Sequence, residues 1–373
     1  MESRKAKIFD MCNLQGFGLE IGGGPSPLLP KSEGYNVETL DHLSRDELNE
    51  KYKNRVTGAI QDIDYVWQGG SYTEAVGKSN CYDFIVASHV IEHSVCIISF
   101  LNDCINLLKP NGILSLVIPD KRFTFDRFRP LSGVSGAIDC LHSDKQRHSI
   151  GAYADWVLNL PLLENRSTPL AFNPHDAKKY IEDYSNADSA EYVDFHHWVF
   201  TKHSFELLVN DLIALGFLHN MRIAKSYNTE GVEFYVSIQK CMANQNLFYK
   251  EQRAVLLEEI KKELMQEEAF VDEGILAQIS KHSSEFIYVY GTGNTGRHTA
   301  LILEKHGISF HGFIVSDGMD KPDFFLDKPV YFLSQVECAC GSVAIVLGMI
   351  ASSSRQVAPL LSGKGARNVY KIF

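Results

Sequence analysis

Three consecutive glycines directly follow an apolar segment near the start of the chain. Residues 18–27 read Gly-Leu-Glu-Ile-Gly-Gly-Gly-Pro-Ser-Pro, which places the glycines at Gly22, Gly23 and Gly24. Glycine adopts positive φ without strain and carries no Cβ, so a strand that ends here can turn sharply and lie close to a ligand. Glu20 puts a negative charge just before the turn, which suits a positively charged ligand better than a phosphate. The loop predicts an α/β fold with a ligand site at the end of its first strand.

Further strands and helices are predicted after this loop in the order of a doubly wound sheet. Apolar runs predict strands at residues 35–41, 55–60, 82–88 and 112–119, and helical spacing predicts a helix at about 95–108. Asp41 ends the second of these segments, 19 residues after Gly22. A doubly wound fold holds ribose hydroxyls with a carboxylate near that position. Asp62 and Ile63 follow the third predicted strand, where an adenine would have its edge.

These motifs together resemble a class I S-adenosylmethionine-dependent methyltransferase. The resemblance covers residues 5–242 and rests on Glu-Ile-Gly-Gly-Gly at 20–24, on Asp41, on Ser-His-Val-Ile-Glu-His at 88–93 and on Leu-Lys-Pro-Asn-Gly-Ile-Leu at 108–114. The run at 119–130 is similar to a bacterial subgroup, methyltransferase type 11-like, that is often encoded with surface-polysaccharide enzymes. The resemblance implies a seven-stranded Rossmann-like sheet that ends in an antiparallel strand pair.

The resemblance also assigns residues to the cofactor S-adenosylmethionine. Asp41 is expected to accept both ribose hydroxyls, and the alternative for it is a helix N-cap. Glu20 is expected near the amino acid part of the cofactor or as a residue that orients the loop. The remaining cofactor-binding residues are the loop Gly22, Gly23 and Gly24, the adenine neighbours Asp62 and Ile63, and Ser88 and His89 beside the methyl group.

A hydroxyl acceptor must lose a proton during methyl transfer, and histidine suits that step near neutral pH. The candidates for the catalytic base are His93, His196, His197 and Asp126. For His93, the alternative is a residue at a helix start that bonds a neighbouring carbonyl. His196 and His197 point to opposite faces if the chain is extended, so only one of them is expected at the acceptor. No third neighbouring ligand is identified, so no metal site is expected.

Four basic residues stand out in an acidic chain and alternate with phenylalanines. Lys121, Arg122, Arg127 and Arg129 are expected to bind an anionic, ring-bearing acceptor such as a phosphorylated or nucleotide-linked sugar. The alternative is that the phenylalanines enter the core while the arginines pair with nearby acids such as Asp126.

The chain is expected to hold two domains with a connector between them. Residues 1–243 form the predicted methyltransferase domain, in which 121–195 are an irregular insertion that acts as a substrate lid. Residues 244–283 form a charged helical connector, whose apolar stripe either packs between domains or mediates homodimer formation. Residues 284–373 form a small Rossmann-like α/β domain.

This second domain contains a further glycine loop, with Gly291, Gly293 and Gly296 between a predicted strand and a predicted helix. Together with Asp317 the loop predicts a nucleotide or nucleotide-sugar site, and the alternative is a structural or partner-docking module.

Composition restricts the classes of function. The chain has 373 residues, eight cysteines and a formal net charge of −10. The acidic balance argues against a broad nucleic-acid surface. An apolar run of about 18 residues is missing, so no membrane span is expected. The N-terminus does not read as a signal peptide, and the cysteines lack zinc-type spacing, so reduced thiols and a cytoplasmic location are expected.

The sequence therefore favours an S-adenosylmethionine-dependent O-methyltransferase that acts on a sugar, nucleotide-sugar or glycan in surface-polysaccharide biosynthesis. The alternatives are N- or C-methylation of a small metabolite, and a methyltransferase-like scaffold with a partner-docking C-terminal module. A dinucleotide oxidoreductase fits poorly, because the first glycine loop lacks Gly-x-Gly-x-x-Gly spacing.

Overall fold

The computed structural model describes residues 3–53, 60–142, 147–159, 174–186, 192–242, 250–265, 273–282, 286–319, 321–337, 343–349 and 351–372. Contacts divide the chain into two compact units. The first unit comprises Met1–Val157 and Pro174–Glu263, and the second comprises Leu158–Asn173 and Leu264–Phe373.

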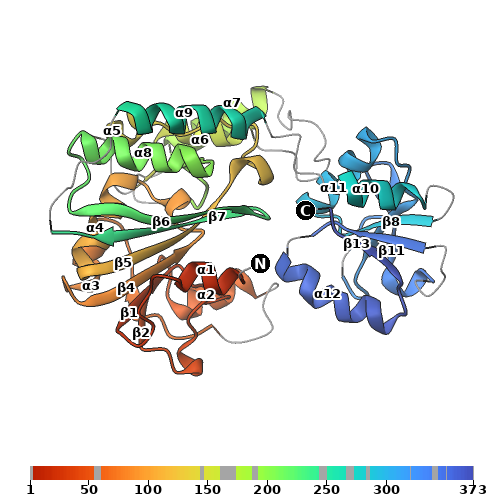
Figure 1. The fold of residues 1–373 in the computed structure, drawn as a ribbon, viewed down its shortest axis with the longest axis horizontal. Helices are drawn as coiled ribbons and strands as arrows, with labels where there is room; N and C mark the ends of the chain where they lie inside the picture. Colours follow the sequence, from red (N-terminus) through yellow and green to blue (C-terminus); the bar gives the residue numbers. More distant parts are fainter. Residues whose placement is uncertain are drawn as a thin grey trace. The chain divides into compact units, whose positions relative to one another are not determined.

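A seven-stranded mixed sheet forms the centre of the first unit (Figure 1). Its strands are β1 (Gly18–Ile21), β2 (Val37–Asp41), β3 (Tyr65–Val66), β4 (Tyr82–Ser88), β5 (Leu108–Pro119), β6 (Met221–Glu230) and β7 (Glu233–Lys240). Their order in the sheet is β3-β2-β1-β4-β5-β7-β6. The first five strands are parallel, and β7 runs antiparallel to both β5 and β6. The predicted α/β class, the seven strands and the final antiparallel pair are confirmed.

Helices cover both faces of this sheet (Figure 1). The helices up to residue 265 are α1 (Arg4–Phe9), α2 (Arg45–Tyr52), α3 (Tyr72–Val76), α4 (Ile97–Leu107), α5 (Val134–Asp139), α6 (Ile150–Asn159), α7 (Pro174–Asn186), α8 (Lys202–Ala214) and α9 (Lys250–Met265), of which α1, α4 and α8 pack on the sheet. The side chains of β4 pack against helices on both faces of the sheet, because successive side chains of a strand point to opposite faces. Ile85 and Ala87 join the cluster that holds α4 and α8, whereas Phe84 and Val86 join the cluster that holds Ile8 of α1.

The strand that pairs with β2 follows the segment predicted as the third strand. Of the segment expected as a strand, residues 55–59 lie outside the described residues, and the strand that pairs with β2 is Tyr65–Val66. The fifth strand begins at Leu108 and therefore includes the Lys-Pro-Asn-Gly cluster expected to precede it. Asn111 adopts a positive φ of 66°, and the pairing between β4 and β5 shifts register here. The strand therefore accommodates Pro110 and Gly112 at a bulge-like irregularity.

The insertion at 121–195 was predicted to be irregular, and this prediction is wrong for α5, α6 and α7. Aromatic side chains connect two of these helices, because the rings of Tyr153 in α6 and Tyr184 in α7 stack with their centroids 4.1 Å apart. Tyr153, Trp156 and Val157 follow helical spacing, a signal present in the sequence.

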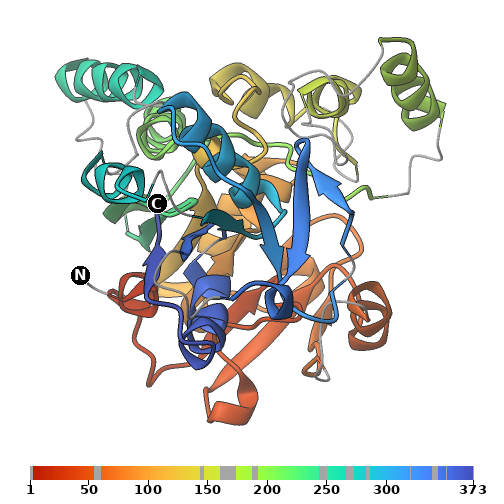
Figure 2. The same ribbon diagram turned by 90° about the vertical axis from the view of Figure 1, so that its right-hand side faces the viewer.

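The second unit contains a six-stranded sheet of its own, drawn in blue in Figures 1 and 2. Its elements are α10 (Glu273–Ser280), β8 (Phe286–Tyr290), α11 (Asn294–Lys305), β9 (Gly312–Val315), β10 (Phe324–Phe325), β11 (Lys328–Phe332), β12 (Val343–Leu347), α12 (Ala351–Gly363) and β13 (Asn368–Tyr370). The strand order is β10-β11-β9-β8-β12-β13, and all neighbours except β10 and β11 pair in parallel. The predicted second α/β sheet is confirmed.

Among the helices that the structure describes, none is long and apolar enough to cross a lipid bilayer.

Candidate functional site

The glycine loop turns sharply where β1 ends. Gly22 and Gly24 have positive φ values of 69° and 44°, and a Cβ on Gly22 would lie 2.5 Å from a methyl carbon of Val90. Glu20 fixes the far side of the loop, because its carboxylate accepts hydrogen bonds from the amides of Leu28 (2.6 Å) and Leu29 (3.1 Å). Burial raises the pKa of Glu20, and these two bonds act against that rise. Glu20 therefore orients the loop.

Asp41 lies at the end of β2, next to the glycine loop. β1 and β2 pair in register with Ile21 opposite Leu40, so the two strands end side by side. One Asp41 oxygen accepts from the amide of Gly24 at 3.2 Å, and the other accepts from the amide of His42 at 2.8 Å. The Asp41 side chain is 3% exposed. These bonds hold the carboxylate at the edge where the carboxyl ends of parallel strands bind ligands in such sheets.

A cavity of about 560 Å³ opens at this edge. Pockets of this size accommodate small molecules. Its lining includes Gly22, Gly24 and Asp41. Aromatic residues also line it, among them Trp67, Tyr72 and Tyr192. Trp67 meets the other two rings edge-on, with centroids 5.6 Å from Tyr72 and 5.8 Å from Tyr192.

The cavity gathers only part of the residues that the sequence singled out. Gly22, Gly24, Asp41, His89 and His93 line it. Several others do not line it: Glu20, Gly23, Asp62, Ile63, Ser88, Asp126, His196, His197, Lys121, Arg122, Arg127 and Arg129. From the insertion, Leu141, Tyr192 and Asp194 contribute to the lining.

The expected adenine edge at Asp62 and Ile63 rested on the misplaced third strand. Because β3 is Tyr65–Val66, both residues precede the strand instead of following its carboxyl end. Asp62 is exposed and pairs with Arg45 at 2.6 Å. The residue that follows β3 at the cavity is Trp67, which the sequence analysis did not select.

Ser88 ends β4, and His89 follows it. His89 lines the cavity, and its Nε2 lies 2.9 Å from a carboxylate oxygen of Glu233 in β7. Arg4 of α1 donates to Glu233 at 2.5 Å and to the Ser88 hydroxyl at 3.3 Å. Burial would raise the pKa of Glu233, but the bonds from His89 and Arg4 outweigh burial and hold it at about 2. Ser88 is thus engaged with α1.

His93 is the candidate base that reaches the cavity. It closes a single helical turn, Ile91–His93, that follows β4. Its Nδ1 lies 2.9 Å from Asp194, whose other oxygen accepts from Lys51 of α2 at 2.8 Å. Burial lowers the pKa of His93, but the nearby carboxylates of Asp194 and Glu92 outweigh burial and raise it. Tyr192 donates to the His93 carbonyl at 3.2 Å, so the turn is fixed from the side of the insertion.

His196 and Asp126 form a buried pair behind His93. The Nδ1 of His196 lies 2.5 Å from Asp126, and Arg129 donates to the second Asp126 oxygen at 2.9 Å. The rings of His93 and His196 meet edge to face, with centroids 4.6 Å apart. Glu92 lies against both imidazoles, 3.9 Å from the Nε2 of each. Glu92, His93 and His196 are thus three neighbouring groups of metal-ligand type. The sequence had singled out the two histidines but not Glu92.

His197 points to a different set of residues. Its Nδ1 lies 3.0 Å from the Nδ1 of His148, and its ring stacks on Trp198 with centroids 4.3 Å apart. Burial lowers the pKa of His197 to about 4. The neighbours His196 and His197 therefore contact separate clusters, and neither side chain lines the cavity.

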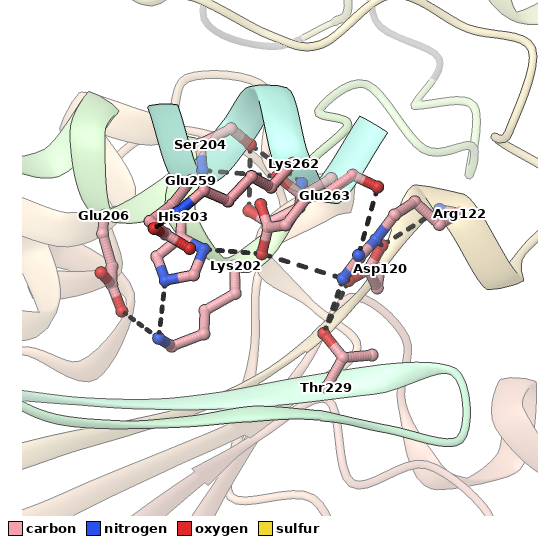
Figure 3. A network of polar contacts seen from close by, with 11 residues as sticks. Asp120, Arg122, Lys202, His203, Ser204, Glu206, Thr229, Glu259, Lys262 and Glu263 are labelled. Carbon is pink, nitrogen blue, oxygen red and sulfur yellow. Dashed lines mark hydrogen bonds and ion pairs between the residues drawn. The ribbon is translucent and has the colours of Figure 1, made fainter. Parts of the chain in front are cut away.

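Of the four basic residues singled out in the sequence, Lys121, Arg122 and Arg129 are buried and Arg127 is half-buried, and none of the four lines the cavity. Figure 3 shows Arg122 beside Asp120, to which its guanidinium donates twice, at 2.7 and 2.9 Å. Thr229 and Glu263 lie at 3.3 and 3.8 Å from its Nη2.

The other three basic residues also contact protein groups. Arg129 pairs with Asp126 and donates to the His196 carbonyl at 2.6 Å. Lys121 donates to the carbonyl of Arg127 at 2.7 Å, and the Arg127 guanidinium lies over the ring of Phe128. For Arg122 and Arg129 the alternative interpretation, pairing with neighbouring acids, describes the geometry.

The second glycine loop has clear packing reasons for two of its glycines. Gly291 has a φ of 108°, and a Cβ on Gly296 would lie 1.9 Å from the Gly291 carbonyl oxygen. Gly293 is the N-cap of α11 and has open space around it. Asp317 is exposed and accepts from the amide and hydroxyl of Ser334 at 3.0 and 2.6 Å.

The site contains residues that sequence reasoning missed. Trp67, Tyr192 and Asp194 line the cavity, and Glu92 joins the histidines. Glu92 stands next to His93 in the motif at 88–93, so the sequence shows that these two are adjacent. It does not show that His196 lies beside them in the folded chain.

No protein-family model matches the chain, and no curated protein matches it. Solved structures similar to it include the CurJ carbon methyltransferase, at 14% identity and a TM-score of 0.29, with 61% of this chain and 48% of that chain covered. A SAM-dependent methyltransferase from Aquifex aeolicus matches at 12% identity and a TM-score of 0.31, covering 64% of this chain and 94% of that one.

A SAM-dependent methyltransferase from Methanosarcina mazei matches at 15% identity and a TM-score of 0.30, covering 63% of this chain and 96% of that one. The chain thus spans about half the length of the CurJ structure and nearly all of the other two. At such low identities and TM-scores these similarities do not assign the chain to a family.

Proposed function

We propose that the chain is an S-adenosylmethionine-dependent methyltransferase that binds its cofactor in the cavity of the first unit. The observation that carries the proposal is the position of Asp41. Its buried carboxylate lines the cavity at the end of β2, directly beside the turn at Gly22 and Gly24. A carboxylate at that edge accepts ribose hydroxyls, and a loop without Cβ atoms lets the cofactor approach the backbone.

The acceptor we propose is a hydroxyl of a sugar, nucleotide-sugar or glycan in surface-polysaccharide biosynthesis. In methyl transfer the acceptor oxygen bonds to the methyl carbon while the carbon–sulfur bond breaks, and the sulfur leaves as a neutral thioether. The hydroxyl proton must go to a base. His93 lines the cavity and is oriented by Asp194, as a general base is oriented by a carboxylate. Trp67 and Tyr192 supply ring faces of the kind that pack against sugars.

Calorimetric titration of the full chain with S-adenosylmethionine and with NAD tests the cofactor. We expect binding of S-adenosylmethionine and none of NAD. Asp41→Asn keeps the shape of the side chain but removes its charge, so affinity should fall about 10- to 100-fold, since a hydrogen bond to a charged group contributes about 1.5–3 kcal/mol. Asp62→Asn is the matched control, because Asp62 is an exposed carboxylate outside the cavity lining.

Two results would contradict the cofactor proposal: NAD binding without S-adenosylmethionine binding, or equal affinity of the wild type and Asp41→Asn. A chain that binds neither ligand would point to the scaffold alternative. The acceptor is tested separately, by incubation with nucleotide-sugar pools and mass spectrometry for the gain of one methyl group. Methylation of an amine or carbon in place of a hydroxyl would replace the proposed acceptor and leave the cofactor proposal intact.

A further inference from the structure

We propose that Glu92, His93 and His196 bind one divalent first-row transition-metal ion, such as Zn²⁺, next to the cavity. The three side chains come from two segments far apart in sequence, the turn after β4 and the segment before α8. Each offers one ligand atom, and these atoms all lie within 4.8 Å of one another. The cluster lies entirely within the first unit.

Distances within the cluster suit an ion better than direct hydrogen bonds. The Nε2 atoms of His93 and His196 each lie 3.9 Å from Oε1 of Glu92. Hydrogen bonds between nitrogen and oxygen are shorter than this, about 2.7–3.2 Å. Three ligands at about 2.0–2.1 Å from one ion lie about 3.3–3.6 Å from one another. The ligand atoms here lie within 4.8 Å of one another, so a single ion requires the side chains to move closer together.

Glu92 provides an independent reason for a cation here. Its side chain is fully buried, at 0% exposure, and neither carboxylate oxygen accepts a hydrogen bond from any described residue. A buried carboxylate without hydrogen bonds is unfavourable unless a cation neutralises it. Its backbone carbonyl accepts from the amides of His197 (2.7 Å) and Trp198 (3.0 Å), so the residue cannot simply swing out to solvent.

Both imidazoles have a carboxylate near their outer nitrogen. The Nδ1 of His196 is hydrogen-bonded to Asp126 at 2.5 Å, whereas the Nδ1 of His93 lies 2.9 Å from Asp194 in an ion-pair contact without hydrogen-bond geometry. Each ring therefore turns its Nε2 toward Glu92. A carboxylate that fixes the outer nitrogen of a ligating histidine is the usual second layer of a metal site. Arg129 fixes Asp126 in turn, at 2.9 Å.

The donor set indicates the kind of metal. Two imidazoles and one carboxylate suit zinc and its first-row neighbours, whereas magnesium and calcium prefer oxygen ligands. Three protein ligands leave a coordination position open for water or an acceptor oxygen. Of the three proposed ligands, His93 lines the cavity, and Glu92 and His196 do not.

If methyl transfer occurs there, the ion would activate the acceptor hydroxyl, and His93 would serve as a ligand in place of the base. That role rests on the proposed function, but metal binding does not.

The competing arrangement is a buried Glu92 neutralised by protonated imidazoles alone. His89 also faces this carboxylate, with its Nδ1 3.5 Å from Oε1, so three imidazoles surround it. Metal titration separates the two arrangements, because uptake of a metal ion displaces the protons of these imidazoles and releases them to solution.

The test is titration of the full chain, freed of metal with a chelator, with Co²⁺ followed by visible absorption and with Zn²⁺ followed by calorimetry. We expect one ion per chain and a cobalt spectrum of nitrogen and oxygen ligation. Glu92→Gln and His196→Ala should each weaken binding more than about 100-fold, and Asp126→Asn, which alters only the orientation of His196, about 10- to 100-fold. His203→Ala is the control, because His203 has a carboxylate partner, Glu263 at 2.8 Å, outside the cluster.

The wild-type titration alone can overturn the proposal, whether or not the variants fold. Absence of stoichiometric binding, or binding that Glu92→Gln leaves unchanged in a protein with a native circular dichroism spectrum, would contradict it. Titration of the metal-free protein with S-adenosylmethionine keeps this result separate from the proposed function. If the chain binds the cofactor but no metal, only the metal proposal is contradicted. If it binds the metal but no cofactor, only the proposed function is contradicted.

Discussion

His148 shows how a single buried imidazole makes stability depend on pH. The residue is 1% exposed, and its Nδ1 lies 3.0 Å from the Nδ1 of His197. Burial, to which the nearby His197 adds, lowers the pKa of His148 from 6.5 to about 2. Between those two values the unfolded chain takes up a proton that the folded chain does not. Acidification therefore favours the unfolded state, and a rise in pH favours the folded state.

We expect His148→Asn to reduce the loss of stability in acid. The wild-type residue should cost the folded state about 1.4 kcal/mol for each pH unit below 6.5, or about 2 kcal/mol at about pH 5. The measurement is the slope of unfolding free energy against pH, from urea denaturation between about pH 7 and about pH 5. A slope does not depend on any uniform stability loss in the variant. His219→Asn, at an exposed site of the same unit, should keep the wild-type slope, and equal slopes in all three proteins would contradict the expectation.

Individual site residues differed in how far the sequence could predict them. The position of Asp41 follows from local information alone, because a strand end and a distance from the glycine loop define it, and the structure does place it in the cavity lining. Glu92, His93 and His196 come together only through the pairing of a turn after β4 with a distant segment. The partner Asp120 of Arg122 lies two residues away in the sequence, whereas Thr229 of β6 comes close only in the folded chain.

At the scale of elements, the packing of α11 against β8 and β12 depends on a glycine. A Cβ on Gly296 would lie 1.9 Å from the carbonyl oxygen of Gly291 and 3.3 Å from that of Gly348. Both neighbours are backbone atoms, so no flexible side chain can move aside. The helix would have to shift away from the two strands.

We expect Gly296→Ala to destabilise the second unit by about 1–3 kcal/mol, the usual range for overpacking. Thermal unfolding followed by circular dichroism measures the change. Gly363→Ala, at the end of α12 in the same unit, is the matched control because a Cβ there meets nothing within 4 Å. If both variants unfold at the wild-type temperature, the close approach at Gly296 does not limit the packing of α11.

Elements with long apolar runs were predictable, whereas short ones were not. Strand β4 was predicted within the bounds that the structure gives, because it is a mostly buried apolar run. Strand β3 has only two residues and half-buried side chains, so no hydrophobic pattern marks it, and only its pairing with β2 reveals it. That error moved the expected adenine edge to Asp62 and away from Trp67.

At the scale of the whole molecule, the buried apolar residues form separate cores. Clusters built on β1, β4, β5 and α8 contain only residues of the first unit, and clusters built on β8, β9 and β12 contain only residues of the second. Hydrophobic burial is the main favourable contribution to folding, so each unit has a source of stability of its own. Two cores predict two unfolding events.

We therefore expect two transitions in calorimetric unfolding of the full chain, of which S-adenosylmethionine shifts one. A ligand at about 100 times its dissociation constant adds about 2.7 kcal/mol to the unit that binds it. For a domain of about 150–250 residues this raises the melting temperature by about 5–10 °C. Gly296→Ala identifies the other transition, because it should lower that one and leave the cofactor-dependent one in place. A single transition that responds to both changes would mean that the two cores unfold cooperatively, against the separation of their buried residues.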